Sequence, residues 1–62
     1  MKKKIQRKID NKFLVSPEMN MWVDNIKDAS SYNLEDYKIT ISTLLLEYTN
    51  NDLIIYNNYM IR

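Results

Sequence analysis

The pattern of apolar residues predicts an amphipathic helix from Pro17 to about Ala29. Ser16 is a favourable N-cap, Pro17 suits the first helical position, and Glu18 places an acid in the first turn. The apolar side chains that follow fall within an arc of about 120°, the width of one buried stripe. They are Met19, Trp22, Val23, Ile26 and Ala29. Met21 lies about 160° from that stripe, so we expect it to be exposed, either as an ordinary surface residue or as a partner contact.

A second amphipathic helix is predicted over LEDYKITISTLLLEYTNN, because Asn33 and Asp36 form a variant of the capping box at its start. One face about 100° wide carries its main apolar stripe, which consists of Leu34, Tyr37, Ile41, Leu44, Leu45 and Tyr48. Ile39 and Leu46 form a narrow second line on the opposite side, which Leu53 continues. Either terminal strands cover this line or it contacts another chain. A strand over KITIS, which alternates and is β-branched, is the competing interpretation.

Short strands are predicted at both ends of the chain. The chain has no Gly, one Pro and eight Asn, and Asn tolerates the left-handed conformation of tight turns. IQRKI and KFLV flank Asp10-Asn11, which is typical of two strands around a two-residue loop, although the first segment could also be helical. LIIY and YMIR flank Asn57-Asn58, which favours a hairpin over a single strand or a continued helix. We therefore expect an α+β fold, with two amphipathic helices packed on short terminal strands or a C-terminal hairpin.

The length of the chain limits its core. A 62-residue domain buries only about 60% of its unfolded surface, and the absence of Cys and His removes disulfides and most structural metal sites. Support must then come from a partner or from a homo-oligomer. We expect a basic arm or strand at residues 1–12 and a single small globular domain at residues 13–62. No apolar run approaches the roughly 18 residues of a membrane span, and MKKK precedes no secretory h-region, so we expect the cytoplasm.

The composition also excludes most catalysis. Without His or Cys there is no imidazole base or thiolate nucleophile. Without Gly there is no Walker loop or dinucleotide fingerprint. Asp24 and Asp28, one turn apart on the first predicted helix, and the adjacent Glu35 and Asp36 could form a Mg²⁺ site or a catalytic acid pair. They are better explained as solvating and dipole-complementing residues of helices. We therefore expect no enzymatic activity, no catalytic residue, no metal, no cofactor and no small-molecule substrate.

The charges are distributed unevenly. Residues 1–12 carry a net charge of +5 and residues 13–62 a net charge of −4. A basic segment of this kind can contact a nucleic acid, an anionic membrane surface or the acidic body of a second copy, or it can simply be solvated. The candidate nucleic-acid contacts are Lys2, Lys3, Lys4, Gln6, Arg7 and Lys8.

The order of a basic strand and two helices resembles the ribbon-helix-helix family of dimeric DNA-binding regulators, over roughly residues 3 to 49. The segments that carry the resemblance are KKKIQRKI as the strand, VSPE at the first helix and ISTLLLEY in the second. In that family, alternate side chains of a two-stranded ribbon read the major groove. The resemblance thus implies that Lys4, Gln6 and Lys8, or the opposite set, read DNA.

These observations favour a small non-enzymatic regulator or inhibitor that binds a larger protein. The candidate partner-binding residues are Met21, Ile39 and Leu46, because each is an apolar residue off the main stripe of its predicted helix. The alternative is a dimeric DNA-binding regulator that uses the basic segment, and a membrane-surface module comes third. The bias toward Asn, Ile, Lys and Tyr is typical of AT-rich genomes, which suggests a viral protein of a phage or a product of a mobile element.

Overall fold

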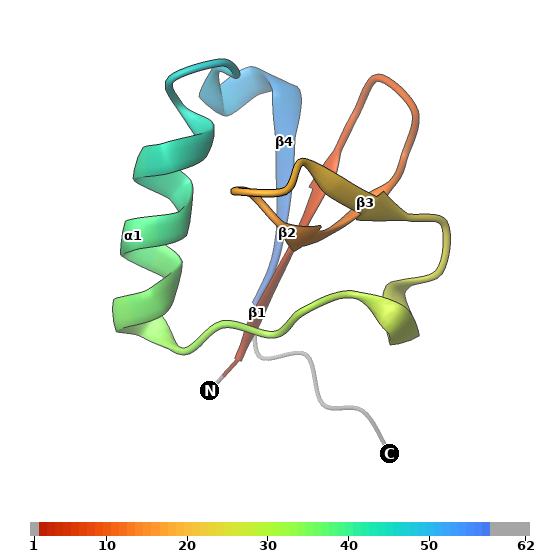
Figure 1. Cartoon of the computed structure of the whole chain (residues 1–62), viewed down its shortest axis with the longest axis horizontal. Helices are drawn as coiled ribbons and strands as arrows, with labels where there is room; N and C mark the ends of the chain where they lie inside the picture. Colours follow the sequence, from red (N-terminus) through yellow and green to blue (C-terminus); the bar gives the residue numbers. More distant parts are fainter. Residues whose placement is uncertain (1, 58–62) are drawn as a thin grey trace.

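The computed structural model describes residues 2–57, and within them it shows an α+β fold of one α-helix and a four-stranded antiparallel sheet (Figure 1). The strand order is β3-β2-β1-β4, so the basic segment near the start of the chain forms an inner strand. In chain order the elements are β1 (Lys3–Arg7), β2 (Phe13–Ser16), β3 (Met21–Val23), the 3₁₀ turn η1 (Ile26–Asp28), α1 (Leu34–Leu44), the 3₁₀ turn η2 (Asn50–Asp52) and β4 (Leu53–Asn57).

β1 is held by neighbours on both sides. It pairs with β4 along its whole length, from Lys3↔Asn57 to Arg7↔Leu53, and with β2 at Gln6↔Phe13. Near the start of β1, Lys3 and Tyr32 exchange two backbone hydrogen bonds of 2.8 Å, and the N–H of Ser30 donates to the carbonyl of Leu14. The segment that leads into α1 therefore bridges β1 and β2 where these two strands are not paired directly.

The strands predicted on either side of Asp10-Asn11 are present as β1 and β2. Asn11 adopts φ 60°, in the left-handed region that Asn tolerates better than most residues with a Cβ. The connection is longer than the expected two residues, because the closing backbone bond runs from the N–H of Arg7 to the carbonyl of Lys12. The Asp10 side chain accepts from the N–H of Lys12 at 3.1 Å and stabilises this loop.

The predicted helix from Pro17 to Ala29 is wrong. The Ser16 hydroxyl does accept from the N–H of Met19 at 3.3 Å, as an N-cap would. Asn20, however, adopts φ 51° and donates to the carbonyl of Pro17, so the chain reverses and returns as β3. Trp22 then pairs with Leu14 of β2. The same local capping contact serves a turn as well as a helix, and strand pairing by β-favouring residues decides between them.

The second predicted helix is present as α1, with the predicted cap: the Asn33 side chain accepts from the N–H of Asp36 at 2.8 Å. The rival strand over KITIS is excluded, since those residues lie within α1. The helix ends at Leu44, earlier than expected, because the next backbone bonds run to the third residue back, from Leu46 to Thr43 and from Glu47 to Leu44. Of the predicted C-terminal hairpin, the first half forms β4, and Asn58 onward lies outside the described residues.

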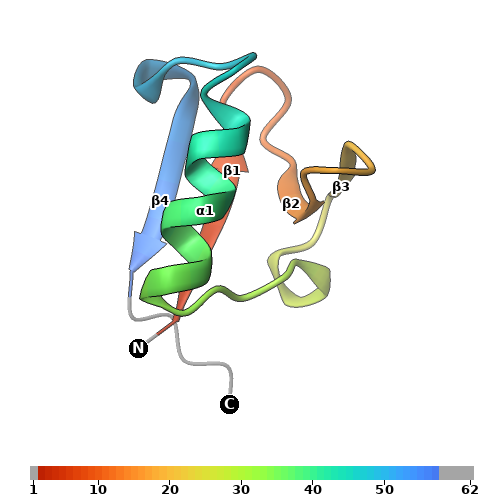
Figure 2. The same ribbon diagram turned by 60° about the vertical axis from the view of Figure 1, so that its left-hand side comes forward.

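The core lies between α1 and one face of the sheet. Figure 2 shows α1 running alongside β1 and β4 on that face. Ile5, Leu14, Leu44 and Leu53 form the buried cluster. Partly buried side chains from α1, the strands and the loops surround it, namely Trp22, Tyr32, Tyr37, Ile41, Tyr48 and Ile55. α1 therefore packs on the sheet through one side, and its outer side is exposed.

No helix in residues 2–57 is long and apolar enough to cross a bilayer.

Candidate functional site

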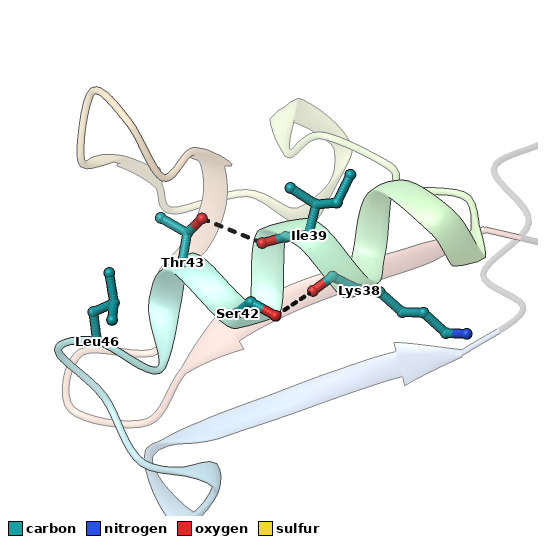
Figure 3. A pocket seen from close by; sticks show the side chains of 5 residues that line it. All are labelled: Lys38, Ile39, Ser42, Thr43 and Leu46. Carbon is teal, nitrogen blue, oxygen red and sulfur yellow. Dashed lines mark hydrogen bonds between the residues drawn. The ribbon is translucent and has the colours of Figure 1, made fainter.

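The outer side of α1 carries a shallow hollow that we call the outer depression. Its volume is about 450 Å³, and it is lined by Lys38, Ile39, Ser42, Thr43 and Leu46 (Figure 3). Ile39 is 68% exposed and Leu46 is 84% exposed. The terminal strands of the described chain do not cover them, and Leu53, the expected continuation of their line, is buried in the core as part of β4. The structure thus brings Ile39 and Leu46 together on one open surface.

The hydroxyl groups on the floor of the outer depression already donate hydrogen bonds within α1. The Ser42 hydroxyl donates to the carbonyl of Lys38 at 2.8 Å, and the Thr43 hydroxyl donates to the carbonyl of Ile39 at 3.2 Å (Figure 3). Each hydroxyl has one proton, and both protons are used within the helix. An apolar side chain resting here would therefore leave no hydroxyl donor unsatisfied.

A second hollow, which we call the turn groove, continues from the first. It lies between the end of α1 and the turn that joins β2 to β3, which extends toward α1 in Figure 1. Its volume is about 200 Å³, and its two walls are Pro17, Glu18 and Asn20 on one side and Thr43, Leu44, Leu46, Glu47 and Tyr48 on the other. Thr43 and Leu46 belong to both hollows, so the two form one continuous surface.

Backbone and side-chain hydrogen bonds hold both walls of the turn groove. After α1, the N–H groups of Leu46 and Tyr48 donate to the carbonyls of Thr43 and Leu44 at 3.2 and 2.8 Å. In the opposite wall, the indole N–H of Trp22 donates to the Asn20 side chain at 2.9 Å. A surface fixed in this way loses little conformational entropy when a partner binds.

Arg7 lies at the centre of a cluster with Asp10, Trp22 and Tyr48, next to the turn groove. Its guanidinium binds the Asp10 carboxylate through two hydrogen bonds of 2.9 and 2.8 Å, donates to the Tyr48 hydroxyl at 3.0 Å, and lies 4.4 Å from the Trp22 ring centroid. Trp22 and Tyr48 also meet edge to face at 5.8 Å. The hydrogen bonds from Arg7 hold the pKa of Asp10 below its usual value. Sequence reasoning missed this cluster, since only the Arg7–Asp10 spacing across a turn hinted at it.

The cluster also extends the surface beyond the turn groove. A further hollow of about 190 Å³ is lined by Arg7, Ile9, Tyr48 and Asp52. Tyr48 lines this hollow and the turn groove alike. Ile9 is exposed in the loop between β1 and β2. Exposed apolar residues with Arg, Trp and Tyr among them are typical of protein-binding hot spots.

The candidate nucleic-acid residues do not form one exposed basic surface. Lys4 is fully buried on the sheet face opposite α1, and its ammonium donates to the carbonyls of Ile26 and Ala29 at 2.7 and 3.0 Å. Gln6 is also buried, between the Asn11 carbonyl and the Tyr56 hydroxyl.

The other candidate cations differ in their surroundings. Arg7 is engaged by Asp10 and Tyr48. Lys3 lies 5.3 Å from the Tyr37 ring centroid and donates to the Asn57 side chain. Lys2 and Lys8 are exposed. The strand, helix, helix order that resembles ribbon-helix-helix regulators is not present, because the strand β3 and the 3₁₀ turn η1 stand where the first helix was expected.

Met21 lies apart from the other two candidate partner contacts. It is 42% exposed at the start of β3, but it lines neither the outer depression nor the turn groove. Its neighbour Trp22 packs on the α1 side of the sheet, and successive side chains of a strand alternate between faces. Met21 therefore belongs to the opposite face.

The acidic residues are spread over the described part of the chain. No group of three metal-ligating side chains occurs within residues 2–57. Asp24 and Asp28 are not one helical turn apart, because the helix that would have aligned them is absent, and Asp24 instead lies 3.9 Å from the Lys12 ammonium. The outer depression and the turn groove together present apolar side chains, with charged side chains at their borders.

None of the protein-family models, curated proteins or solved structures compared with this chain matches it significantly.

Proposed function

We propose that this protein is a small non-enzymatic regulator or inhibitor that binds a larger protein through the outer depression and the turn groove. One observation carries the proposal: Ile39 and Leu46 are both more than two-thirds exposed and border one continuous hollow. Single exposed apolar residues are common on protein surfaces. Two of them on a fixed surface, with the hydroxyl protons between them already donated within the helix, are suited to an apolar contact.

The size of the molecule agrees with this mode of action. Its accessible surface is 4481 Å², and a standard interface covers about 800 Å² of each partner. An interface of that size would occupy roughly a fifth of the accessible surface of this protein. Binding there would cover the partner's own surface and change its activity without any chemistry by this chain.

The proposal is tested with Ile39→Asp and Leu46→Asp. Both side chains are exposed, so the variants should fold like the wild type, as circular dichroism would verify. Each should bind a partner captured from the source cells at least about 30-fold more weakly, which is the effect of removing one hot spot. The measurement is titration calorimetry with the captured partner.

Leu34→Asp is the matched control, because Leu34 is 55% exposed on the same helix but lines neither hollow. It should leave the affinity unchanged. A partner that binds all three variants as tightly as it binds the wild type would contradict the proposal. So would an equal loss of affinity in the control.

A further inference from the structure

We infer that the turn groove receives a basic and apolar segment of the partner protein. A Lys or Arg side chain of that segment would enter between Glu18 and Glu47, and its apolar side chains would rest on Leu46 and Ile39. This inference depends on the proposed function, because it names the chemical class of the partner at the same surface.

The charged side chains of the turn groove are all acidic. Glu18 lies in the wall formed by the β2–β3 turn and Glu47 lies in the wall that follows α1. Both are exposed, and no Lys or Arg lines this groove. Across residues 2–57, the ion pairs are Arg7–Asp10 and Lys12–Asp24, so neither glutamate is paired there. A cation entering the groove would meet two free carboxylates.

The helix adds to this negative potential. α1 has eleven residues, and its aligned peptide dipoles place partial negative charge at the C-terminal end. The N-terminal end is complemented by acids in the first turn, but the last turn contains no basic residue. Leu44, the last residue of α1, lines the turn groove. The negative end of the helix and both carboxylates therefore act on the same hollow, and no Lys or Arg of residues 2–57 lines it.

The charges at the two ends of the surface have opposite signs and would orient a bound segment. Lys38 lines the outer depression, whereas Glu18 and Glu47 line the turn groove. Ile39 and Leu46 lie between Lys38 and Glu47 along the chain, Ile39 within α1 and Leu46 two residues beyond its end. A partner segment whose apolar residues contact both side chains would place its basic end in the turn groove and its neutral or acidic end beside Lys38. The charges thereby select both the partner and its orientation.

A selection from random peptides tests the inference and does not require that the partner be identified. Peptides of twelve residues displayed on phage are selected on the wild-type protein, with Leu46→Asp used for counter-selection. The enriched peptides should combine Lys or Arg with apolar residues. Their affinities are then measured with synthetic peptides by the fluorescence of Trp22, the sole tryptophan, whose ring contacts Tyr48 in the groove wall.

The double variant Glu18→Gln/Glu47→Gln should weaken these peptides by about 2- to 30-fold, the effect of losing two exposed ion pairs, and should reduce the salt dependence of binding. Glu35→Gln is the matched control, because it removes one exposed acid from the other end of α1 and should change neither quantity. Both outcomes together support the inference.

Other outcomes overturn it in distinguishable ways. Enriched peptides that are neutral or acidic, or that bind the double variant as well as the wild type, refute a basic partner; the proposed function survives if Leu46→Asp still abolishes binding. Peptides unaffected by Ile39→Asp and Leu46→Asp refute both proposals. Failure to enrich any peptide also refutes the inference. Light scattering that shows self-association abolished by Leu46→Asp identifies the occupant as a second copy, which likewise overturns it.

Discussion

Replacing Lys4 by Met should destabilise the protein severely, even though Lys4 belongs to a basic segment whose side chains would be expected to be exposed. The side chain of Lys4 is fully buried, and its ammonium donates to the carbonyls of Ile26 and Ala29 at 2.7 and 3.0 Å. Methionine keeps most of the volume and supplies an unbranched apolar side chain of similar length. It removes the donors, however, and leaves two backbone carbonyls near η1 without this partner.

The magnitude follows from these contacts. A hydrogen bond to a charged group contributes about 1.5–3 kcal/mol, and the two bonds are partly offset because a buried ammonium no longer has to be desolvated. We expect a net loss of about 2–4 kcal/mol, compared with a total stability of about 3–9 kcal/mol for a domain of this length. The midpoint of thermal unfolding should fall by roughly 10–30 °C.

Urea unfolding followed by circular dichroism measures the change, with Lys8→Met as the control. Lys8 is exposed, and its replacement should stay within about 0.5 kcal/mol of the wild type. The same experiment bears on the DNA-binding alternative. An exposed phosphate contact at Lys4 would show unchanged stability together with weaker, less salt-dependent binding to duplex DNA. Unchanged stability in Lys4→Met would refute the structural role of this side chain.

Three further predictions concern the turn at Asn11, the stability of the protein at acidic pH and the two sides of α1. Asn11→Ala should cost about 1–2 kcal/mol in urea unfolding, because Asn11 has φ 60°, whereas Asn11→Gly should be tolerated. The pKa of Asp10 is lowered by Arg7 and that of Asp52 by the backbone N–H of Thr49. The stability that these carboxylates contribute is therefore complete above the unfolded-state pKa of about 3.9 and is lost as the pH falls through the lower folded-state values. In Asp10→Asn/Asp52→Asn, the free energy of unfolding should decrease less steeply with falling pH than in the wild type. Leu44→Ala should cost about 2–5 kcal/mol because Leu44 is 5% exposed, while Leu46→Ala should change stability by no more than about 0.5 kcal/mol.

The parts of the fold that could be predicted depend on neighbours in sequence. The Asn33 cap of α1 and the positive φ of Asn11 are local properties of a few residues, and both are found in the structure. The predicted helix after Ser16 failed because its capping contact is equally compatible with a turn. Only the pairing of Trp22 with β2 decides between the two, and that pairing cannot be read from the local pattern.

The candidate site was predictable to a similar degree. The seven-residue spacing of Ile39 and Leu46 is visible in the sequence, and both residues line the outer depression of α1. The opposite wall of the turn groove could not be anticipated, because Glu18 was expected at the start of a helix and instead lies in a turn beside the end of α1. The burial of Lys4 also depends on segments distant in sequence and was not predicted, because it results from the inner position of β1 in the sheet.

The inner position of β1 affects the order of events during protein synthesis. β1 leaves the ribosome well before its partner β4, which is made about fifty residues later, as the pair Ile5↔Ile55 shows. Until β4 arrives, one side of β1 stays unpaired and Leu53 is missing from the core. A nascent chain interrupted before Leu53 would therefore expose an open strand edge, which favours aggregation. The four-stranded sheet is therefore complete only after β4 has been made.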